Sequence, residues 1–231
     1  MAVHHHKSPI VTDGLIFQVD AANKLGGNVS NTRNLVSPTQ SGTFTNGASV
    51  VDGSFDFDGV DDYIRVLDST TNFFGFANKV GSISTWVNFN SALVERPIAA
   101  KRETGSLGKR HWIFTMLASD SKIYFISYET DFLQDTAIST STLSTNIWYY
   151  LTVTLTPSQT KIYINGALDS TTSNTYTTIQ DDQAHLDIGS RGANGDIRYL
   201  DGQISNFKIY NKTLTQAEVT QNYEATKHKF E

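Results

Sequence analysis

The sequence predicts an all-β protein, a two-sheet antiparallel sandwich that ends in one short helix. Most segments alternate apolar and polar residues with period two and are rich in Val, Ile, Thr, Tyr and Phe. Turn residues divide these segments into about a dozen strands, which is typical of a β-sandwich rather than an α/β fold. The 231 residues contain no cysteine, so the apolar core must hold a single large domain without disulfides.

The expected strands follow one another along the chain. The first covers residues 14–20, and a loop of residues 21–53, rich in Asn, Gly, Ser and Thr, follows with one short strand near 42–45. The segments SFDF and YIRV then flank an aspartate-rich turn. The remaining strands are expected in SISTWVNF, PIAAK, HWIFTML, KIYFISY, TNIWYYLTVTL, KIYING, ALDSTT, LDIGS and GQISNFKIYN.

Two local signals specify a hairpin and the helix. Asn165 and Gly166 both tolerate positive φ, so the pair predicts a type I′ turn between two strands. Thr215 and Glu218 match the capping-box pattern, which places the start of a helix over residues 216–226.

These elements divide the chain into three parts. We expect an N-terminal arm at residues 1–13, the sandwich at 14–212, and a helix with its tail at 213–231. The arm carries His4–His6, which could bind a metal or line a symmetry axis of an oligomer. A polar mobile tail is the simpler interpretation of these histidines.

Charge and hydropathy exclude several classes of partner. The net charge is −5 and only 18% of the residues are charged. No Lys/Arg cluster is longer than two residues, which disfavours nucleic acid as a partner. No apolar run could span a bilayer, and the N-terminus lacks the apolar core of a signal peptide. We therefore expect a protein made in the cytosol, with no membrane span.

Five motifs occur in order along the chain: FDFDGVDDYIRV, SISTWVNF, NIWYYLTVTL, KIYINGAL and GQISNFKIYNKTLTQAEV. Together they resemble the laminin-G-like jelly roll of the concanavalin A-like lectin/glucanase superfamily, over residues 14–223. The resemblance implies two antiparallel sheets, one concave and one convex.

The two ends of the chain carry a further resemblance. The opening SPIVTDGLIFQVDAAN and the ending YNKTLTQAEVTQNYEATK are similar to modules in structural proteins of tailed phages, notably marine ones. This implies a virion protein, made in the host cytoplasm, whose partners are capsid or tail proteins and other copies of itself. The expected function is a non-enzymatic capsid decoration or fibre component that also attaches to host surface glycans. The alternative is a free carbohydrate-binding, lectin-like module.

The aspartate-rich turn holds the candidate metal ligands Asp58, Asp61 and Asp62. Asp is favoured in turns because its side chain bonds to nearby backbone N–H groups, so a purely structural turn is one interpretation. The other is one structural calcium ion, although the spacing does not match the EF-hand loop. The superfamily resemblance implies a calcium near this loop with an acidic partner in the last strand, where Ser205 and Asn206 stand instead.

A glycosidase site is not expected. Hydrolases of the superfamily carry E-x-D-x-E on one strand, which places three carboxylates on one face. Glu129 and Asp131 have the spacing of one such pair, but Leu133 occupies the third position. The chain also lacks a G-x-S-x-G segment, so we expect no enzymatic activity.

A glycan could instead bind to exposed rings and to the basic loop 100–112, because the apolar face of a sugar stacks on an aromatic ring. Trp86 and Trp148 are expected in the core. A solvated surface is the simpler interpretation of this loop and of a second turn-rich loop at residues 191–196. The rings considered are Trp112, Tyr124, Tyr128, Tyr199 and Phe132. The candidate ligand-binding residues are Arg102, Lys109, Arg110, Trp112, Tyr128 and Arg191.

Overall fold

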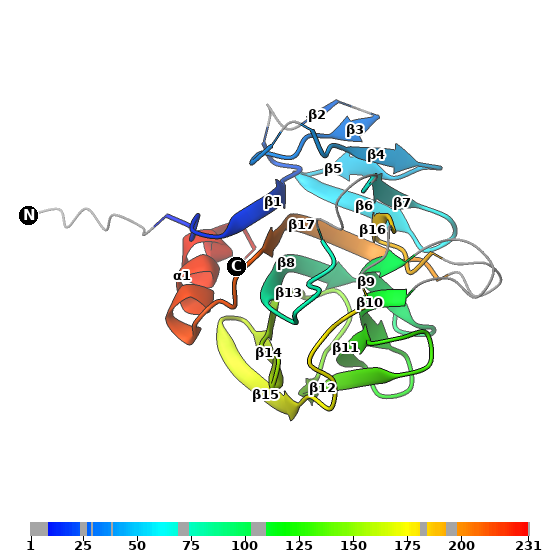
Figure 1. Cartoon of the computed structure of the whole chain (residues 1–231). Coiled ribbons are helices and arrows are strands. Elements are labelled where there is room, and N and C mark those ends of the chain that lie inside the picture. The colour runs from blue at the N-terminus through cyan, green and yellow to red at the C-terminus, as the bar shows by residue number, and fades with distance from the viewer. Residues whose placement is uncertain are drawn as a thin grey trace, which may run out of the picture.

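The computed structural model describes residues 9–23, 27–28, 30–37, 39–68, 74–102, 110–180, 184–192 and 198–230. In this part of the chain, two antiparallel sheets pack face to face and one α-helix lies beside them (Figure 1). The predicted all-β sandwich with a short C-terminal helix is therefore confirmed. The residues His4–His6 and Lys109 lie outside the described residues.

Sheet 1 has eight strands in the described part of the chain, and β17 lies near its middle. The strand β1 (Leu15–Val19) pairs with β17 at one side of the main path. The main path runs, in order, through β15 (Ala167–Ser173), β14 (Gln159–Ile164), β13 (Trp148–Leu155), β8 (Gly81–Phe89), β17 (Asp201–Tyr210), β6 (Ser54–Asp58) and β5 (Ser49–Val51).

Sheet 2 has nine strands among the described residues. Within it, β4 confirms the short strand predicted near 42–45, whereas β2 and β3, like β5 of sheet 1, lie in a segment that the sequence predicts as loop. The order is β12 (Gln134–Thr142), β11 (Lys122–Tyr128), β10 (Arg110–Leu117), β9 (Arg96–Arg102), β16 (Leu186–Ile188), β7 (Tyr63–Val66), β4 (Gly42–Thr45), β3 (Asn31–Thr32) and β2 (Gly27–Asn28).

The core lies between the two sheets and is built from alternate residues of each strand. In β6, Phe55 and Phe57 belong to this core, so Asp56 and Asp58 point the other way. This alternation places the acidic side chains of the FDFD segment outside the core, as the period of the sequence predicts.

The helix α1 (Gln216–Thr226) begins where the capping box predicts and continues into the 3₁₀ turn η1 (Lys227–Lys229). The Thr215 side chain accepts a hydrogen bond from the Glu218 N–H, and the Glu218 side chain bonds back to the Thr215 N–H. The predicted hairpin is also present, since both Asn165 (φ 51°) and Gly166 (φ 79°) adopt positive φ between β14 and β15.

The first described residues pack against the helix rather than extending away from it. Val11 is buried, and its N–H donates to Asn222 Oδ1 at 2.8 Å. Its carbonyl accepts a hydrogen bond from the Tyr210 hydroxyl at 3.1 Å. The last part of the predicted arm is thereby fastened to α1 and β17.

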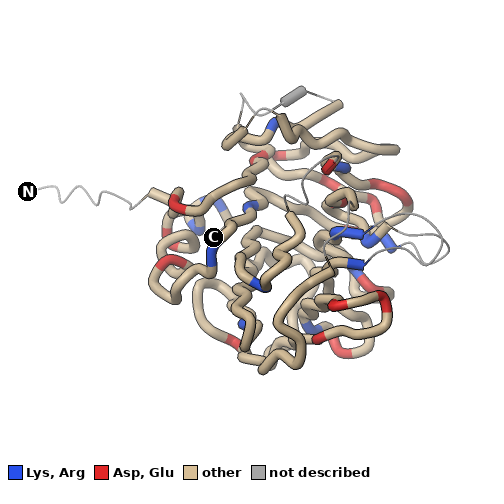
Figure 2. The backbone as a smooth tube through the Cα atoms, viewed as in Figure 1, with Lys and Arg blue, Asp and Glu red and all other residues tan. Residues whose placement is uncertain are grey.

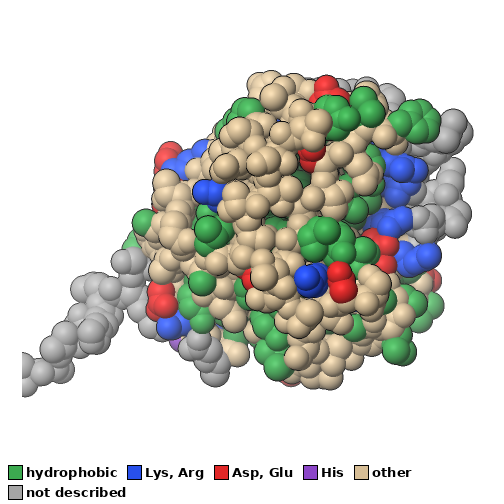
Figure 3. Space-filling view, turned by 90° about the horizontal axis from the view of Figure 1, so that it is seen from below, with side chains coloured by type: hydrophobic (Ala, Val, Ile, Leu, Met, Phe, Trp, Pro, Cys, Tyr) green, Lys and Arg blue, Asp and Glu red, His purple; other side chains and the backbone are tan. Residues whose placement is uncertain are grey.

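The edge strands β12 and β15, one from each sheet, meet at one side of the sandwich. The Thr140 N–H donates to Asp169 Oδ2 at 2.6 Å, which joins the two sheets there. Figure 3 looks onto this side of the molecule, where few side chains are charged.

Candidate functional site

The acidic loop between β6 and β7 brings the three predicted metal ligands together. One oxygen from each of Asp58, Asp61 and Asp62 lies within 4.8 Å of the others. Gly59 permits the sharp turn because it adopts φ of 78°. The Val60 N–H donates to Asp58 Oδ1 at 2.8 Å, which holds the turn in place. Figure 2 shows acidic residues gathered where β6 runs into β7.

Asp62 is the unusual member of this group because its side chain is buried. The residue is only 4% exposed. Its Oδ2 accepts the Asp58 N–H at 3.1 Å, but its Oδ1 has no hydrogen-bond partner. The Gly47 backbone lies beside that oxygen without forming a hydrogen bond of normal geometry. Burial raises the pKa of Asp62, and the negative charges of Asp58 and Asp61 raise it further.

These features fit a hard cation. Three carboxylates at this separation repel one another, and one buried oxygen is left without a donor. A calcium ion takes oxygen ligands of this kind and would relieve both costs. Asp58, Asp61 and Asp62 are the residues that would hold it.

The last strand contributes an acidic residue that the sequence reasoning missed. Asp201 begins β17 and pairs directly with Asp58 across the sheet. It forms an ion pair with Arg96 at 3.4 Å, and Arg96 also donates to the Tyr199 carbonyl at 3.2 Å. The sequence predicts the start of the last strand one residue later, at Gly202, which leaves Asp201 outside it.

Beside the acidic loop, four side chains form a row that we call the Tyr/Arg ladder: Tyr199, Tyr63, Arg65 and Asp187. The rings of Tyr63 and Tyr199 stack with their centroids 6.3 Å apart and their planes at 30°. The Arg65 guanidinium also lies over the Tyr63 ring, with its central carbon 5.0 Å from the ring centroid. Both tyrosines and Arg65 are half-buried, so each keeps part of its surface open to solvent.

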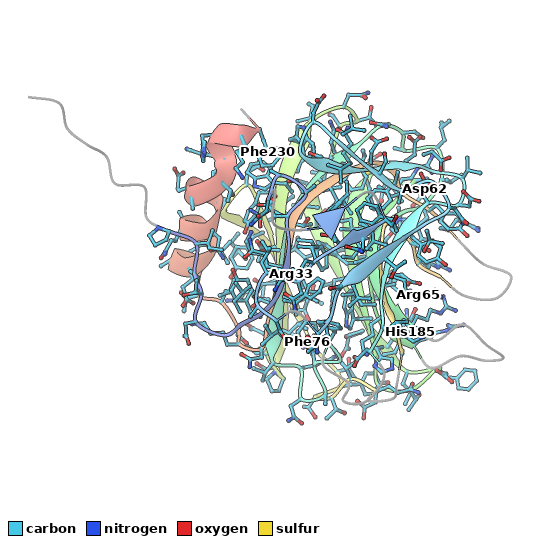
Figure 4. The ribbon with its side chains drawn as sticks, turned by 90° about the horizontal axis from the view of Figure 1, so that it is seen from above. Arg33, Asp62, Arg65, Phe76, His185 and Phe230 are labelled. Atoms are coloured by element: carbon cyan, nitrogen blue, oxygen red, sulfur yellow. The ribbon has the colours of Figure 1, made fainter. Side chains whose placement is uncertain are left out.

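Asp187 fixes the orientation of Arg65. Arg65 Nε donates to Asp187 Oδ1 at 2.8 Å and Nη2 to Oδ2 at 2.7 Å, a bidentate pair. The hydrogen bonds to Asp187 raise the pKa of the Arg65 guanidinium further above its ordinary value, so it stays charged. Figure 4 shows Arg65 and Asp62 on the same flank of the molecule.

The local sequence explains why these side chains face outward. In the segment YIRV, Ile64 and Val66 are fully buried in the core, so Tyr63 and Arg65 must face the opposite way. In β16, Leu186 and Ile188 enter the core and leave Asp187 on the same outer face as Arg65, its direct cross-strand partner.

The predicted ligand-binding residues do not form one site. Trp112 is 0% exposed, belongs to the core and donates through Nε1 to the Phe74 carbonyl at 2.8 Å, so its prediction as a ligand platform is wrong. Tyr128 and Arg102 are buried as well. Arg110 lies over the Tyr128 ring at 5.7 Å, in a separate contact on β10 and β11.

Among the predicted ligand-binding residues, Arg191 is the nearest in sequence to a residue of the ladder, Asp187. Arg191 forms an ion pair with Glu95. The next residue, Gly192, approaches Asp187 so closely that a Cβ there would lie 2.6 Å from Oδ2. Of the rings considered, Tyr199 is the one that the structure places in the ladder, whereas Phe132 stands alone on the surface.

The family model for the concanavalin A-like lectin/glucanases superfamily matches residues 57–220. This is more than half of the chain, and the chain therefore belongs to that superfamily. The matched region begins inside the acidic loop motif and ends inside α1. Among curated proteins, none matches this chain.

Similar solved structures support the fold. A Trypanosoma rangeli sialidase in complex with sialic acid has a TM-score of 0.74 at 16% identity, covering 95% of this chain and 34% of its own. The binding domain of botulinum neurotoxin DC in complex with SialylT has a TM-score of 0.70 at 16% identity, covering 92% of this chain and 52% of its own. This chain thus spans between a third and about half of those proteins, and the likeness shows the fold alone.

No helix among the described residues has the length and apolar character needed to cross a membrane.

Proposed function

We propose that this chain is a non-catalytic carbohydrate-binding domain that holds a glycan on the Tyr/Arg ladder. The observation that carries the proposal is the stacked, half-exposed pair Tyr63 and Tyr199, with Arg65 fixed beside it. Aromatic faces receive the apolar face of a sugar ring, and a positioned guanidinium can bond to its hydroxyl groups. The lectin-like fold supports the same function.

The charges around the ladder favour a neutral sugar over an anionic one. Arg65 is paired with Asp187, Arg191 with Glu95, and Arg96 with Asp201. Because these cations already have carboxylate partners within the chain, an acidic sugar would have to displace one of them. A neutral sugar needs only hydrogen bonds and stacking, which the ladder offers without that exchange.

We also propose that a calcium ion at Asp58, Asp61 and Asp62 supports this site. Tyr63 follows Asp62 directly, so an ion that fixes the acidic loop also fixes the start of β7. A bound structural ion of this kind adds stability and pre-organises the ring for its ligand. The ion would take no part in chemistry.

A non-catalytic role fits the placement of the acids that the sequence singled out. The Glu129 carboxylate accepts a hydrogen bond from the Thr178 hydroxyl, and Asp131 Oδ1 accepts one from the backbone N–H of Arg110 at 3.2 Å. Both carboxylates therefore hold chain segments together. They lack the third acid that the glucanase pattern requires.

The virion role, the capsid or tail partners and the oligomeric state remain predictions. Native mass spectrometry checks the last of these, since a symmetric oligomer is expected and a monomer at micromolar concentration would contradict it.

The experiment that tests the proposed function is a glycan array followed by titration of its best neutral ligand in the presence of calcium. Tyr199→Ala should weaken binding at least about tenfold, which corresponds to about 1.4 kcal/mol. Phe132→Ala is the matched control, because it removes an 83% exposed ring far from the ladder in the chain and should leave the affinity unchanged. An array without hits, or an affinity that Tyr199→Ala does not change, would refute the proposal.

A further inference from the structure

The outer face of sheet 1 carries two tryptophans on neighbouring strands. Trp86 lies on β8 and Trp148 on β13, and both occupy positions that alternate with core residues such as Val87 and Leu151. They face away from the sandwich core, which corrects the expectation that they belong to it. Trp86 is nevertheless only 2% exposed, so something else covers it.

The cover comes from α1, whose Tyr223 ring centroid lies 5.7 Å from that of Trp86, and from the segment that follows the helix. The ring of Phe230 stacks on Trp86 with a centroid distance of 4.4 Å and an angle of 22°. The same ring lies 4.8 Å from the Trp148 centroid, so Phe230 occupies a slot between the two indoles. Trp86 Nε1 also donates to Thr226 Oγ1 at 2.8 Å, at the end of the helix. Figure 4 shows Phe230 beside α1, on another side of the molecule from Asp62 and Arg65.

A row of polar side chains extends from this slot across the same face. Trp148 pairs with Asn88, Asn88 with Gln203, and Gln203 with Asp56, so the row crosses four neighbouring strands. At the usual strand separation its length is about 14 Å. Gln203 Nε2 donates to Asp56 Oδ1 at 3.1 Å, whereas the buried Asn88 Oδ1 has no hydrogen-bond partner.

We propose that this slot and its polar row form a second sugar-binding site, which Phe230 closes. The inference rests on the proposed carbohydrate-binding function and assigns it a site on the other sheet. Two indoles would stack on a sugar ring, and Asn88 would accept a hydroxyl hydrogen that the Phe230 ring cannot supply. A purely apolar partner would leave Asn88 Oδ1 unsatisfied, which favours a hydroxyl-rich ligand.

The segment can open without unfolding the sandwich. Besides the ring contacts, Lys229 Nζ lies 3.8 Å from Asp20 Oδ2, and that lysine side chain is 42% exposed. The Asp20 side chain is only 11% exposed, but the pair is long and its lysine end is in solvent, so it holds the segment weakly. The helix itself keeps its own anchors, because Val219 and Asn222 are buried independently of Phe230.

Closure by Phe230 competes with the ligand, so the apparent affinity falls by the fraction of molecules in which the slot is open. Removal of the ring by Phe230→Ala should therefore raise sugar affinity at this site. A slot that is open in one molecule in ten predicts an increase of about tenfold.

The test uses neutral glucose and galactose oligosaccharides titrated into the full chain and into Phe230→Ala, followed by tryptophan fluorescence. Two of the three tryptophans line the slot, whereas Trp112 lies in the core. Phe230→Ala should bind a sugar at least about tenfold more tightly than the unchanged chain. A second change, Trp148→Ala, should abolish that gain, and Phe132→Ala is the matched single-ring control.

The two proposals fail in distinguishable ways. If Phe230→Ala keeps its thermal stability to within a few degrees yet gains no sugar affinity, while Tyr199→Ala still abolishes the array ligand, the second site is refuted and the proposed function stands. If Tyr199→Ala has no effect but Trp148→Ala abolishes the gain, the ladder is refuted as the binding surface. If neither the unchanged chain nor Phe230→Ala binds any sugar, both proposals are refuted.

Discussion

Removal of calcium should destabilise the unchanged chain, whereas the substitution Asp62→Asn should stabilise the chain once calcium has been removed. In the absence of a cation, the folded chain keeps a buried carboxylate beside two others, and burial raises the pKa of Asp62. Calcium removes that cost, whereas an amide at position 62 removes both the charge and a ligand. Asp62→Asn should therefore be more stable than the unchanged chain in chelator and less stable in calcium.

The magnitude follows from mass action. At a free calcium concentration one hundred times the dissociation constant, a single site adds about 2.7 kcal/mol to the free energy of unfolding. For a chain of 231 residues, each kcal/mol shifts the melting temperature by about 2–4 °C, so calcium should raise it by about 5–10 °C. The same addition should leave the melting temperature of Asp62→Asn almost unchanged.

The pH dependence of stability gives an independent check that the ionised Asp62 carboxylate destabilises the calcium-free chain. Because the folded-state pKa of Asp62 is raised above 3.8, the folded chain binds more protons than the unfolded chain between 3.8 and the raised pKa. In chelator, stability should therefore fall as pH rises through this window, and calcium should remove that contribution.

Thermal melting with calcium and with chelator is the assay, and Asp52→Asn, an exposed turn position with φ of 49°, is the matched control. A calcium shift that is the same in Asp62→Asn as in the unchanged chain would show that Asp62 is not a ligand of the ion.

Three further predictions concern groups outside the proposed sites. Asp135→Asn should cost about 3–5 kcal/mol in urea unfolding, because Lys79 would remain buried without its carboxylate partner. Burial opposes ionisation of Asp135, but Lys79 and two backbone N–H groups hold its pKa below 3.8, so this contribution should vanish as pH falls through that lowered pKa. Burial lowers the pKa of Lys208 to about 7, so the folded chain binds fewer protons than the unfolded one between 7 and 10.5. Stability should rise with pH across that window, and Lys208→Met should flatten the rise in a pH series of urea unfolding. Thr215→Ala should lose the capping box and about 1 kcal/mol, measured as a melting temperature lower by about 2–4 °C.

Local chemistry made the helix and the hairpin predictable. The Thr215 cap acts on N–H groups three residues away, and the two residues Asn165 and Gly166 alone set the turn geometry. Neither signal depends on distant parts of the chain. The FDFD alternation was predictable for the same reason, because one face of β6 is apolar and the other acidic.

The tryptophans show where the period of the sequence is insufficient. Trp112 lies in a segment with apolar residues on both faces, so alternation cannot tell which face enters the core. Trp86 is buried by a segment 140 residues away, the α1 terminus, as its hydrogen bond to Thr226 shows. Burial of an outer face by a distant helix leaves no local signal.

The Tyr/Arg ladder was half predictable. The period of YIRV already places Tyr63 and Arg65 together on the outer face once Ile64 and Val66 are assigned to the core. Their partner Asp187 is 122 residues from Arg65 along the chain. That pairing depends on β7 lying beside β16, which only the strand order of sheet 2 reveals.

The most direct test of carbohydrate binding at the ladder is amide chemical-shift mapping of the best neutral array ligand, titrated into the calcium-loaded chain. Binding at the ladder should produce its largest ligand-dependent shifts at the amides of Tyr63, Arg65, Asp187 and Tyr199, with little change around Phe132. Shifts that saturate elsewhere and leave these four amides unmoved would contradict it.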